Sequence, residues 1–166
     1  MRHPFAVRLL FLAALAVPAT AAAQKAVIVV RHVENDGDTV TEVGRTEAAR
    51  LAVVLQSANM GAVYSTNTKR AIATATPLAE ARKLQVQLYD TAAATTGFDA
   101  TPFVAKLRKD NANDVVLVVG HWPTIPNLLK VLGCREEITI APRGFDDLFV
   151  VVPKGEGAAT LVRLKY

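Results

Sequence analysis

The sequence predicts an α/β protein: a three-layer α/β/α sandwich around a mostly parallel sheet, with an antiparallel hairpin at its C-terminal edge. Ala26–Val30 and Val115–Val119 are short, wholly apolar runs rich in β-branched residues, which is typical of strands buried on both faces of a sheet. Strand-like and helix-like segments alternate between these two runs, and this alternation favours helices on both faces. In the tail, Leu148–Val152 and Ala159–Leu164 flank a turn that contains proline and glycine, which predicts two antiparallel strands.

The first predicted helix follows a polar stretch, Arg31–Val40. This stretch contains Asp36-Gly37 and is expected to be a loop. Thr41 can cap the helix, because its hydroxyl is able to accept a hydrogen bond from a free N–H of the first turn. The helix has one apolar stripe at helical spacing, made of Ala48, Leu51, Ala52 and Leu55.

A strand and a second helix are expected next. The strand is Ala62–Tyr64, and Ser65 or Thr66 can cap the helix, which extends to about Arg82. Pro77 lies inside this helix, where the missing N–H and the ring predict a kink or a break.

The second half of the chain completes the alternation. Leu84–Tyr89 alternates between apolar and polar residues, as a half-exposed strand does. Thr101-Pro102 is expected to begin a helix, with threonine as the cap and proline at the first position, that ends near Asn111. A short helix is predicted at Ile125–Leu132, ended by Gly133.

The N-terminus has the three parts of a secretory signal peptide. Arg2 and Arg8 form a basic start, Leu9–Val17 is an unbroken apolar run, and small residues at 21–23 provide a cleavage site. The apolar run is shorter than the roughly 20 residues that span a bilayer, although a membrane anchor or a buried helix is the alternative. We expect residues 1–23 to be a signal peptide, residues 24–166 to be the folded domain, and the protein to be periplasmic or secreted.

Charge and cysteine content exclude some classes of protein. The chain has 19 basic and 15 acidic residues, and the expected signal peptide carries two of the arginines. The remaining balance is small and the basic residues are scattered, which argues against a nucleic-acid-binding protein. Cys134 is the single cysteine, so no disulfide within the chain is possible, and we interpret it as a small buried apolar residue.

Two histidines mark one edge of the predicted sheet. His32 and His121 each follow a wholly apolar strand within two residues, and ligands bind outside the carboxyl ends of strands in such sheets. Arg31 directly precedes His32, and Arg70 lies about one turn into the helix after Ala62–Tyr64. Paired arginines grip phosphate oxygens in forked hydrogen bonds.

These residue types predict phosphoryl chemistry. A neutral imidazole is a nucleophile that can form a covalent intermediate, and nearby guanidinium groups keep His32 unprotonated while they stabilise the transferred phosphoryl group. Because the arginines supply positive charge, we expect no metal and no other cofactor. The partner is a small phosphorylated substrate, and the sequence does not predict the oligomeric state.

Four motifs in order resemble those of the histidine phosphatase superfamily, the phosphoglycerate-mutase-like proteins. Arg31-His32-Val33-Glu34 resembles the family's Arg-His-Gly-Glu motif, and Thr41–Ala48 resembles its helix start with Gly-Arg. Ser65–Ala71, with Thr74-Ala75, is similar to its segment with Arg-Ala and Thr-Ala, and Val119–Pro126 is similar to its Val-Gly-His segment. The resemblance covers nearly all of residues 25–132.

The resemblance implies a phosphatase that hydrolyses phosphomonoesters through a phosphohistidine on His32. It assigns phosphate binding to Arg31, Arg70 and His121. The long insertion of many family mutases is missing between the second and third motifs, which favours a compact stand-alone phosphatase. Val33 replaces the usual glycine, and we expect it to crowd the entrance of the pocket.

The proton donor is left open. The family often places a glutamate in or after the third strand, where this chain has Asp90. Glu34 is the rival because it is close to His32 in sequence, and a compact relative can also lack a donor side chain. Trp122 follows His121 where another branch has an acidic donor, and it can stack on a substrate or have a core or rim role.

Two other functions fit the same residues. One is a non-catalytic domain that binds a phosphorylated ligand, since a fold does not imply activity. The other is a metal hydrolase using His32, Glu34 and His121, although their spacing fits no standard zinc pattern. Near the tail, Arg143, Asp146 and Asp147 are interpreted as loop charges.

Overall fold

Six strands form one mixed sheet in the computed structural model, which describes residues 25–91, 98–154 and 158–166. The strands are β1 (Ala26–Arg31), β4 (Met60–Thr66), β5 (Val86–Tyr89), β6 (Val115–Gly120), β7 (Asp147–Val152) and β8 (Thr160–Lys165). Their order across the sheet is β5-β4-β6-β1-β7-β8. Strands β5, β4, β6 and β1 pair in parallel, whereas β7 pairs antiparallel with both β1 and β8. The predicted mostly parallel sheet with an antiparallel edge hairpin is confirmed.

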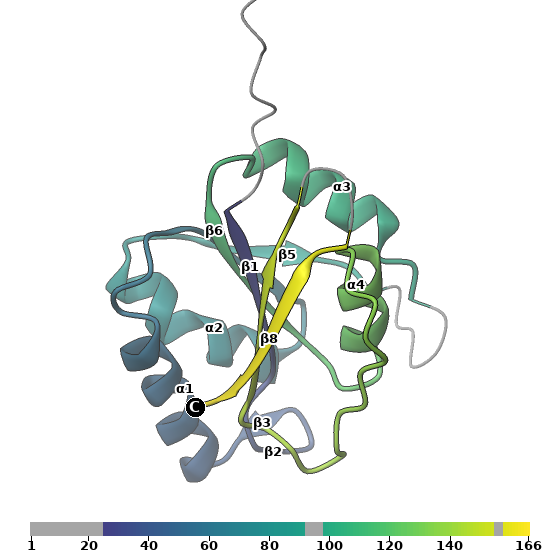
Figure 1. Cartoon of the computed structure of the whole chain (residues 1–166). Coiled ribbons are helices and arrows are strands. Elements are labelled where there is room, and N and C mark those ends of the chain that lie inside the picture. The colour runs from purple at the N-terminus through teal and green to yellow at the C-terminus, as the bar shows by residue number, and fades with distance from the viewer. Residues whose placement is uncertain (1–24, 92–97, 155–157) are drawn as a thin grey trace, which may run out of the picture.

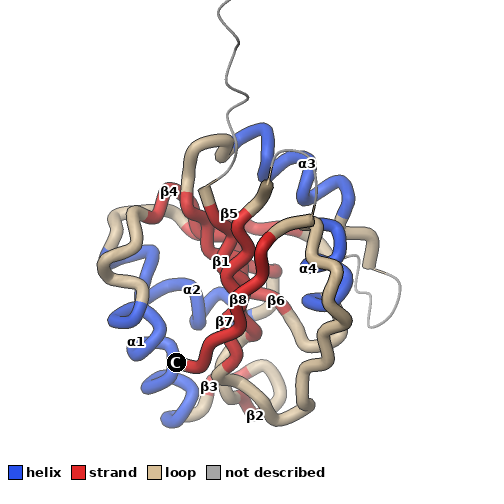
Figure 2. Tube along the Cα trace, viewed as in Figure 1, coloured by secondary structure: helices blue, strands red, loops and turns tan. Residues whose placement is uncertain are grey.

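In the part of the chain that the structure describes, four helices cover the two faces of this sheet. They are α1 (Glu42–Val54), α2 (Lys69–Ala81), α3 (Thr101–Asp110) and α4 (Ile125–Val131). Helices α1 and α2 lie on one face, and α3 and α4 lie on the other (Figures 1 and 2). This is the predicted three-layer sandwich.

Strand β1 contributes to the cores on both faces of the sheet. Val27 and Val29 pack with the α3 and α4 side, whereas Ile28 and Val30 pack with the α1 and α2 side. All four side chains are at most 5% exposed. Alternate residues therefore point to opposite faces, and an uninterrupted apolar run is what a strand between two helix layers requires.

The loop expected over residues 31–40 contains a short hairpin. Strands β2 (Asn35–Asp36) and β3 (Thr39–Val40) pair antiparallel. Gly37 has φ +58° in the turn between them, a conformation that glycine adopts without steric cost. The prediction of an irregular loop was therefore wrong here, because Asp-Gly also forms tight hairpin turns.

The start of α2 also differs from the prediction. Ser65 and Thr66 are buried residues of β4, and the cap is Thr68, whose Oγ1 accepts a hydrogen bond from the Ala71 N–H at 3.3 Å. The helix runs across Pro77 without a break. Packing of its apolar face against the sheet outweighs the one backbone hydrogen bond that proline cannot donate.

Two further predictions, one at the start of α3 and one at the start of β7, were wrong. Thr101 is the first residue of α3 rather than its cap, which is Ala100. Asp147 is not a loop charge: it begins β7, its side chain is 1% exposed, and both of its carboxylate oxygens accept forked hydrogen bonds from Arg163 at 2.8 and 2.9 Å. A cation on the neighbouring strand β8 makes burial of this carboxylate tolerable.

The chain order creates a switch point between β1 and β6. After β1 the chain crosses to β4 on one side, and after β6 it crosses to β7 on the other side. In open α/β sheets a ligand crevice forms outside the carboxyl ends of two such strands. The residues that directly follow β1 and β6 are His32 and His121.

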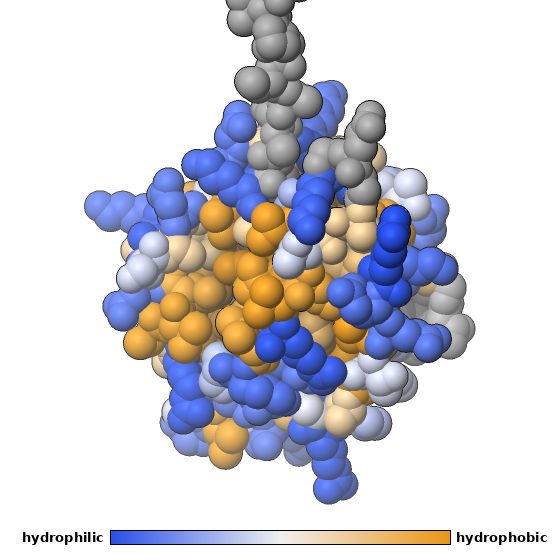
Figure 3. Space-filling view, in the orientation of Figure 1, coloured by the Kyte–Doolittle hydropathy of each residue, from blue (hydrophilic) through white to orange (hydrophobic). Residues whose placement is uncertain are grey.

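Cys134, the N-terminus and the edge strand β8 lie away from this crevice or outside the described residues. Cys134 is buried and free, as expected. Residues 1–23, the expected signal peptide, lie outside the described residues, and within the described ones no helix is long and apolar enough to cross a membrane. The edge strand β8 exposes Val162 and Leu164, and Figure 3 shows apolar side chains gathered over this strand.

Candidate active site

His32 and His121 lie side by side at the switch point. Arg31 and Gly120 are the last paired residues of β1 and β6, and the His32 N–H extends this ladder by donating to the Gly120 carbonyl at 3.0 Å. The two imidazole ring centroids are 5.1 Å apart, with 58° between the ring planes. The parallel register of two neighbouring strands thus brings together residues that are distant in sequence.

The His32 ring has a fixed tautomer. Its Nδ1 lies 2.9 Å from the Val33 carbonyl oxygen, and because a carbonyl can only accept, Nδ1 carries the proton. Burial lowers the pKa of His32 to about 4. Charge interactions with His121, Arg31 and Arg70 also lower this pKa, whereas the hydrogen bond to Val33 raises it. His32 is therefore neutral at pH 7, and the lone pair of Nε2 is available.

Val33 holds the end of β1 against α2. Its N–H donates to the Thr74 hydroxyl oxygen at 3.0 Å, and that hydroxyl donates to the Arg70 carbonyl at 2.8 Å. The Val33 side chain is completely buried. The expectation that Val33 crowds the pocket entrance was therefore wrong, because its side chain points into the interior.

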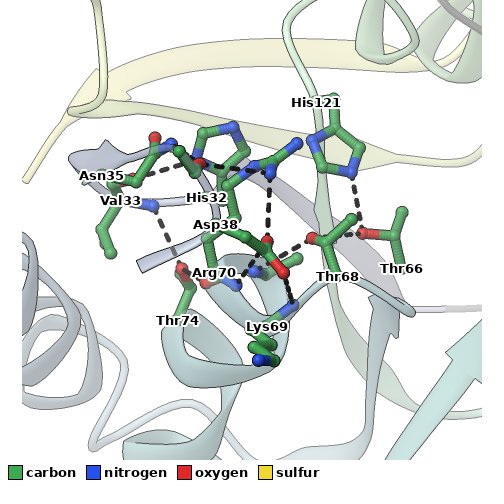
Figure 4. Close-up of polar contacts among 12 residues, drawn as sticks. His32, Val33, Asn35, Asp38, Thr66, Thr68, Lys69, Arg70, Thr74 and His121 are labelled. Carbon is green, nitrogen blue, oxygen red and sulfur yellow. Dashed lines mark hydrogen bonds and ion pairs between the residues drawn. The ribbon is translucent and has the colours of Figure 1, made fainter. Parts of the chain in front are cut away.

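The His121 ring is oriented from β4. Its Nε2 lies 2.9 Å from the Thr66 hydroxyl oxygen. Burial lowers the pKa of His121 to about 4, with further lowering by the charges of Arg70 and Arg31. Figure 4 shows His32, Arg70 and His121 next to one another at the start of α2.

The Arg31 guanidinium is held by the segment before β7. Its Nη1 donates to the carbonyl of Pro142 at 2.6 Å, with longer bonds to those of Ala141 and Gly144. The Phe145 ring lies 4.1 Å from its guanidinium carbon. The Nε of Arg31 is buried and has no hydrogen-bond partner among the described residues.

Arg70 is held in a similar way on α2. Its Nη1 donates to the Asp38 carboxylate at 3.0 Å, and Asp38 also accepts hydrogen bonds from the backbone N–H groups of Lys69 and Arg70. Its Nε, like that of Arg31, is buried without a partner in the described chain. Burial and then the charge of Arg70 lower the pKa of Arg31, which shows that the two cations act on the same region.

This arrangement can bind a phosphoryl group. A buried N–H without an acceptor costs about 1–3 kcal/mol, and both arginines present such a donor next to His32. An anionic phosphoryl group can accept from both, while the neutral Nε2 of His32 can attack its phosphorus atom. The structure brings together all four predicted pocket residues: Arg31, His32, Arg70 and His121.

The two candidates for the proton donor lie differently. Asp90 is exposed and directly follows β5 at the carboxyl edge of the sheet. Strand β5 is three strands away from β1, which corresponds to roughly 14 Å at a spacing of about 4.8 Å. Glu34 is nearer in sequence, but its carboxylate accepts a hydrogen bond at 2.9 Å from Thr41, which itself caps α1.

The alternative metal site is not assembled. Within the described residues there is no group of three histidine, cysteine or acidic side chains placed to hold a metal ion. His32, Glu34 and His121 therefore do not form the three-ligand site that a metal hydrolase requires. Trp122, beside His121, is 46% exposed and thus lies at the rim rather than in the core.

Sequence reasoning did not single out the residues that orient the pocket. These are Asp38 beneath Arg70, Thr66 beside His121, Thr74 against Val33 and Phe145 over Arg31. Thr66 and Thr74 lie inside the motif segments, so the motifs could have identified them as residues of the site. No local pattern marks Asp38 or Phe145, because each acts on a residue that is distant in sequence.

A family model supports the resemblance seen in the motifs. Residues 27–92 match the model of the histidine phosphatase superfamily (branch 1). This segment includes Arg31, His32 and Arg70, whereas His121 lies beyond it. No curated protein sequence is a significant match to the chain.

Solved structures share the fold over almost their whole length. The protein histidine phosphatase SixA, complexed with tungstate, is 20% identical with a TM-score of 0.67, and the alignment covers 84% of this chain and 96% of that one. A mycobacterial glucosyl-3-phosphoglycerate phosphatase is 16% identical with a TM-score of 0.64, covering 86% and 98%. A phosphoserine phosphatase mutant from Entamoeba histolytica is 17% identical with a TM-score of 0.62, covering 83% and 95%.

Proposed function

We propose, from the premise that this chain belongs to the histidine phosphatase superfamily, that it is a metal-independent phosphatase acting on small phosphomonoesters. His32 is the nucleophile, and Arg31, Arg70 and His121 bind the phosphoryl group. The observation that carries this proposal is the neutral His32 imidazole beside two buried arginine N–H donors that have no hydrogen-bond partner among the described residues. Together they can bind an anionic phosphoryl group.

The reaction has two steps. Nε2 of His32 attacks the phosphorus atom, the N–P bond forms, and the P–O bond to the leaving group breaks. The leaving oxygen takes a proton from an acid in the site or from water. Water then attacks the phosphorus atom, the N–P bond breaks, and inorganic phosphate leaves with His32 neutral again.

The arginines lower the barrier of both steps. Negative charge is spread over the three oxygens of the transferred phosphoryl group in the transition state, and fixed cations stabilise that charge without reorganising. The carbonyl oxygens of Ala141, Pro142 and Gly144 hold Arg31, and Asp38 holds Arg70. Both guanidinium groups are therefore already in place before the substrate binds.

The substrate class and the location extend this proposal. Solved relatives are a phosphoserine phosphatase in complex with phosphoserine and with 3-phosphoglyceric acid, and we propose a substrate of similar size for this chain. Residues 1–23 are proposed to direct export to the periplasm or the outside of the cell. The catalytic domain is then residues 24–166.

Hydrolysis of p-nitrophenyl phosphate by the purified protein and by His32→Asn tests the proposal. We expect turnover by the wild type in EDTA and a phosphoryl adduct on protein quenched in alkali, where phosphohistidine is stable, both of which are lost in His32→Asn. Phosphate binding without turnover or adduct would instead identify a non-catalytic binding domain. Activity lost in EDTA and restored by zinc would identify a metal hydrolase.

A further inference from the structure

A cavity of about 650 Å³ is lined by Phe145, whose ring also contacts Arg31 and His32 of the phosphate pocket. Its walls come from the segment after β1, from α1, from the segment before β7 and from the C-terminus, and they include Glu34, Glu47, Arg50, Arg143, Phe145 and Tyr166. Cavities of roughly 300–1,000 Å³ hold small organic ligands. The volume thus suits the part of a substrate that remains once its phosphoryl group is bound.

Phe145 joins the cavity to the reacting group. Its ring lies 4.1 Å from the Arg31 guanidinium carbon and 6.0 Å from the centroid of the His32 ring, and it also lines the cavity. The Tyr166 hydroxyl donates to the Phe145 carbonyl at 3.1 Å and fixes this segment. Phe145 is therefore a wall that the cavity and the surroundings of Arg31 and His32 share.

The acidic side chains of the cavity already have partners within the protein. The Glu34 carboxylate accepts a hydrogen bond from the Thr41 hydroxyl at 2.9 Å. The Glu47 carboxylate accepts one from the Glu34 N–H at 2.8 Å, and Asp146 pairs with Lys165 at 2.6 Å. Their charges are thus directed toward donors of the fold rather than toward a ligand.

The two basic side chains have no such partners. Neither Arg50 nor Arg143 has a side-chain hydrogen bond or ion pair with any residue in the described part of the chain. Arg50 comes from α1 and Arg143 from the segment before β7, so they reach the cavity from two sides. The side chains of this cavity with donors free for a ligand are therefore the two guanidinium groups, which bind carboxylates and phosphates through forked hydrogen bonds.

We propose that this cavity binds the leaving group of the substrate, and that Arg50 and Arg143 bind a second anionic group on it. The inference rests on the proposed phosphatase activity and narrows its substrates to phosphomonoesters that carry a carboxylate or another phosphate. The Phe145 ring contacts the apolar part of the leaving group.

Two matched esters test this inference. 4-Carboxyphenyl phosphate and 4-carbamoylphenyl phosphate have nearly the same shape, but only the first carries a second anion. We expect the wild type to have a kcat/KM at least roughly tenfold higher for the carboxylate ester, the size of effect that charge-assisted hydrogen bonds produce. In Arg50→Gln and Arg143→Gln this ratio falls, and in the double variant it approaches one.

Arg135→Gln is the matched control. Arg135 is also exposed. It lies near Gly133, whose carbonyl accepts a hydrogen bond from the N–H of Ala159, the residue before β8. That is the opposite end of β8 from Tyr166, so the wild-type ratio is kept in this variant. A wild-type ratio near one, or a ratio that Arg50→Gln and Arg143→Gln leave unchanged, would overturn the inference.

A binding measurement separates this inference from the proposed activity. If neither ester is hydrolysed, the phosphatase proposal fails, and calorimetry with the same two esters decides the inference alone. Tighter binding of the carboxylate ester that is lost in Arg50→Gln and Arg143→Gln would support the anion site. Equal binding of both esters would refute it.

Discussion

Nδ1 of His32 lies 2.9 Å from the carbonyl oxygen of Val33, the next residue in the chain. This short local bond fixes the proton on Nδ1 and leaves Nε2 as the basic atom. Val33 is itself fixed, since its side chain is completely buried and its N–H donates to Thr74 on α2. The orientation of the His32 ring is therefore set by the junction between β1 and α2.

The first prediction concerns the atom that becomes phosphorylated. We expect the phosphoryl group on Nε2 of His32 and not on Nδ1, because Nδ1 is protonated and bonded to Val33. Phosphorus NMR of the trapped protein, denatured in alkali, distinguishes the two isomers. An Nδ1 adduct would show that the ring turns over before it reacts and would contradict the fixed tautomer.

The second prediction follows from the pKa of His32, which burial lowers from 6.5 to about 4. Between these values the unfolded chain binds a proton that the folded chain does not, so stability decreases as the pH falls from 6.5 to 4. Protonation of His32 lowers the free energy of unfolding by about 3 kcal/mol, and this loss is complete below pH 4. Urea unfolding across this range measures it.

His32→Asn is the control for this pH dependence. It has no titrating group at this position, so its free energy of unfolding should decrease less between pH 6.5 and 4 than that of the wild type. His121, whose pKa burial also lowers to about 4, accounts for part of the decrease that remains. Identical pH dependence in both proteins would mean that His32 is not kept neutral by the fold.

The layers and the sheet were predictable because local patterns encode them. The β-branched apolar runs of β1 and β6 are typical of strands with both faces covered, which the structure confirms, and the Thr41 cap was also found correctly. The boundaries were less predictable where tertiary packing decided them. Ser65 and Thr66 favour helix caps in isolation, but β4 extends through them because it pairs with both β5 and β6.

Only the residues of the site that directly follow a strand could be predicted from the fold pattern. His32 and His121 follow apolar strands, so the switch-point rule brings them together. The partners of the arginines come from loops whose paths no periodic pattern specifies. Asp38 reaches Arg70 through the β2–β3 hairpin, and Phe145 reaches Arg31 from the segment before β7.

The third prediction concerns the proton donor. If Asp90 donates to the leaving oxygen, Asp90→Asn should slow hydrolysis of an alkyl phosphate by about 100-fold, the lower range for general acid catalysis. Hydrolysis of p-nitrophenyl phosphate should change much less, because nitrophenolate leaves without a proton. Glu34→Gln in parallel tests the rival donor. Equal losses on both esters would remove Asp90 from this role.

The fourth prediction concerns Asp38, which accepts hydrogen bonds from the Arg70 guanidinium and from the backbone N–H groups of Lys69 and Arg70. Removing this carboxylate frees a guanidinium that must be in place before phosphate binds. We expect Asp38→Ala to lower kcat/KM about tenfold, the value of one charge-assisted hydrogen bond. Asp38→Asn keeps an acceptor oxygen and should lose less.

Asp36→Ala is the matched control for Asp38, because Asp36 is an exposed carboxylate of the same hairpin and its side chain has no hydrogen bond or ion pair among the described residues. Calorimetry with inorganic phosphate supplies a second measurement that does not depend on turnover. Weaker phosphate binding in Asp38→Ala, with normal binding in Asp36→Ala, is expected if Asp38 positions Arg70. Equal losses in both alanine variants would instead assign the effect to the hairpin as a whole, because a carboxylate that does not touch Arg70 would then matter as much as the one that does.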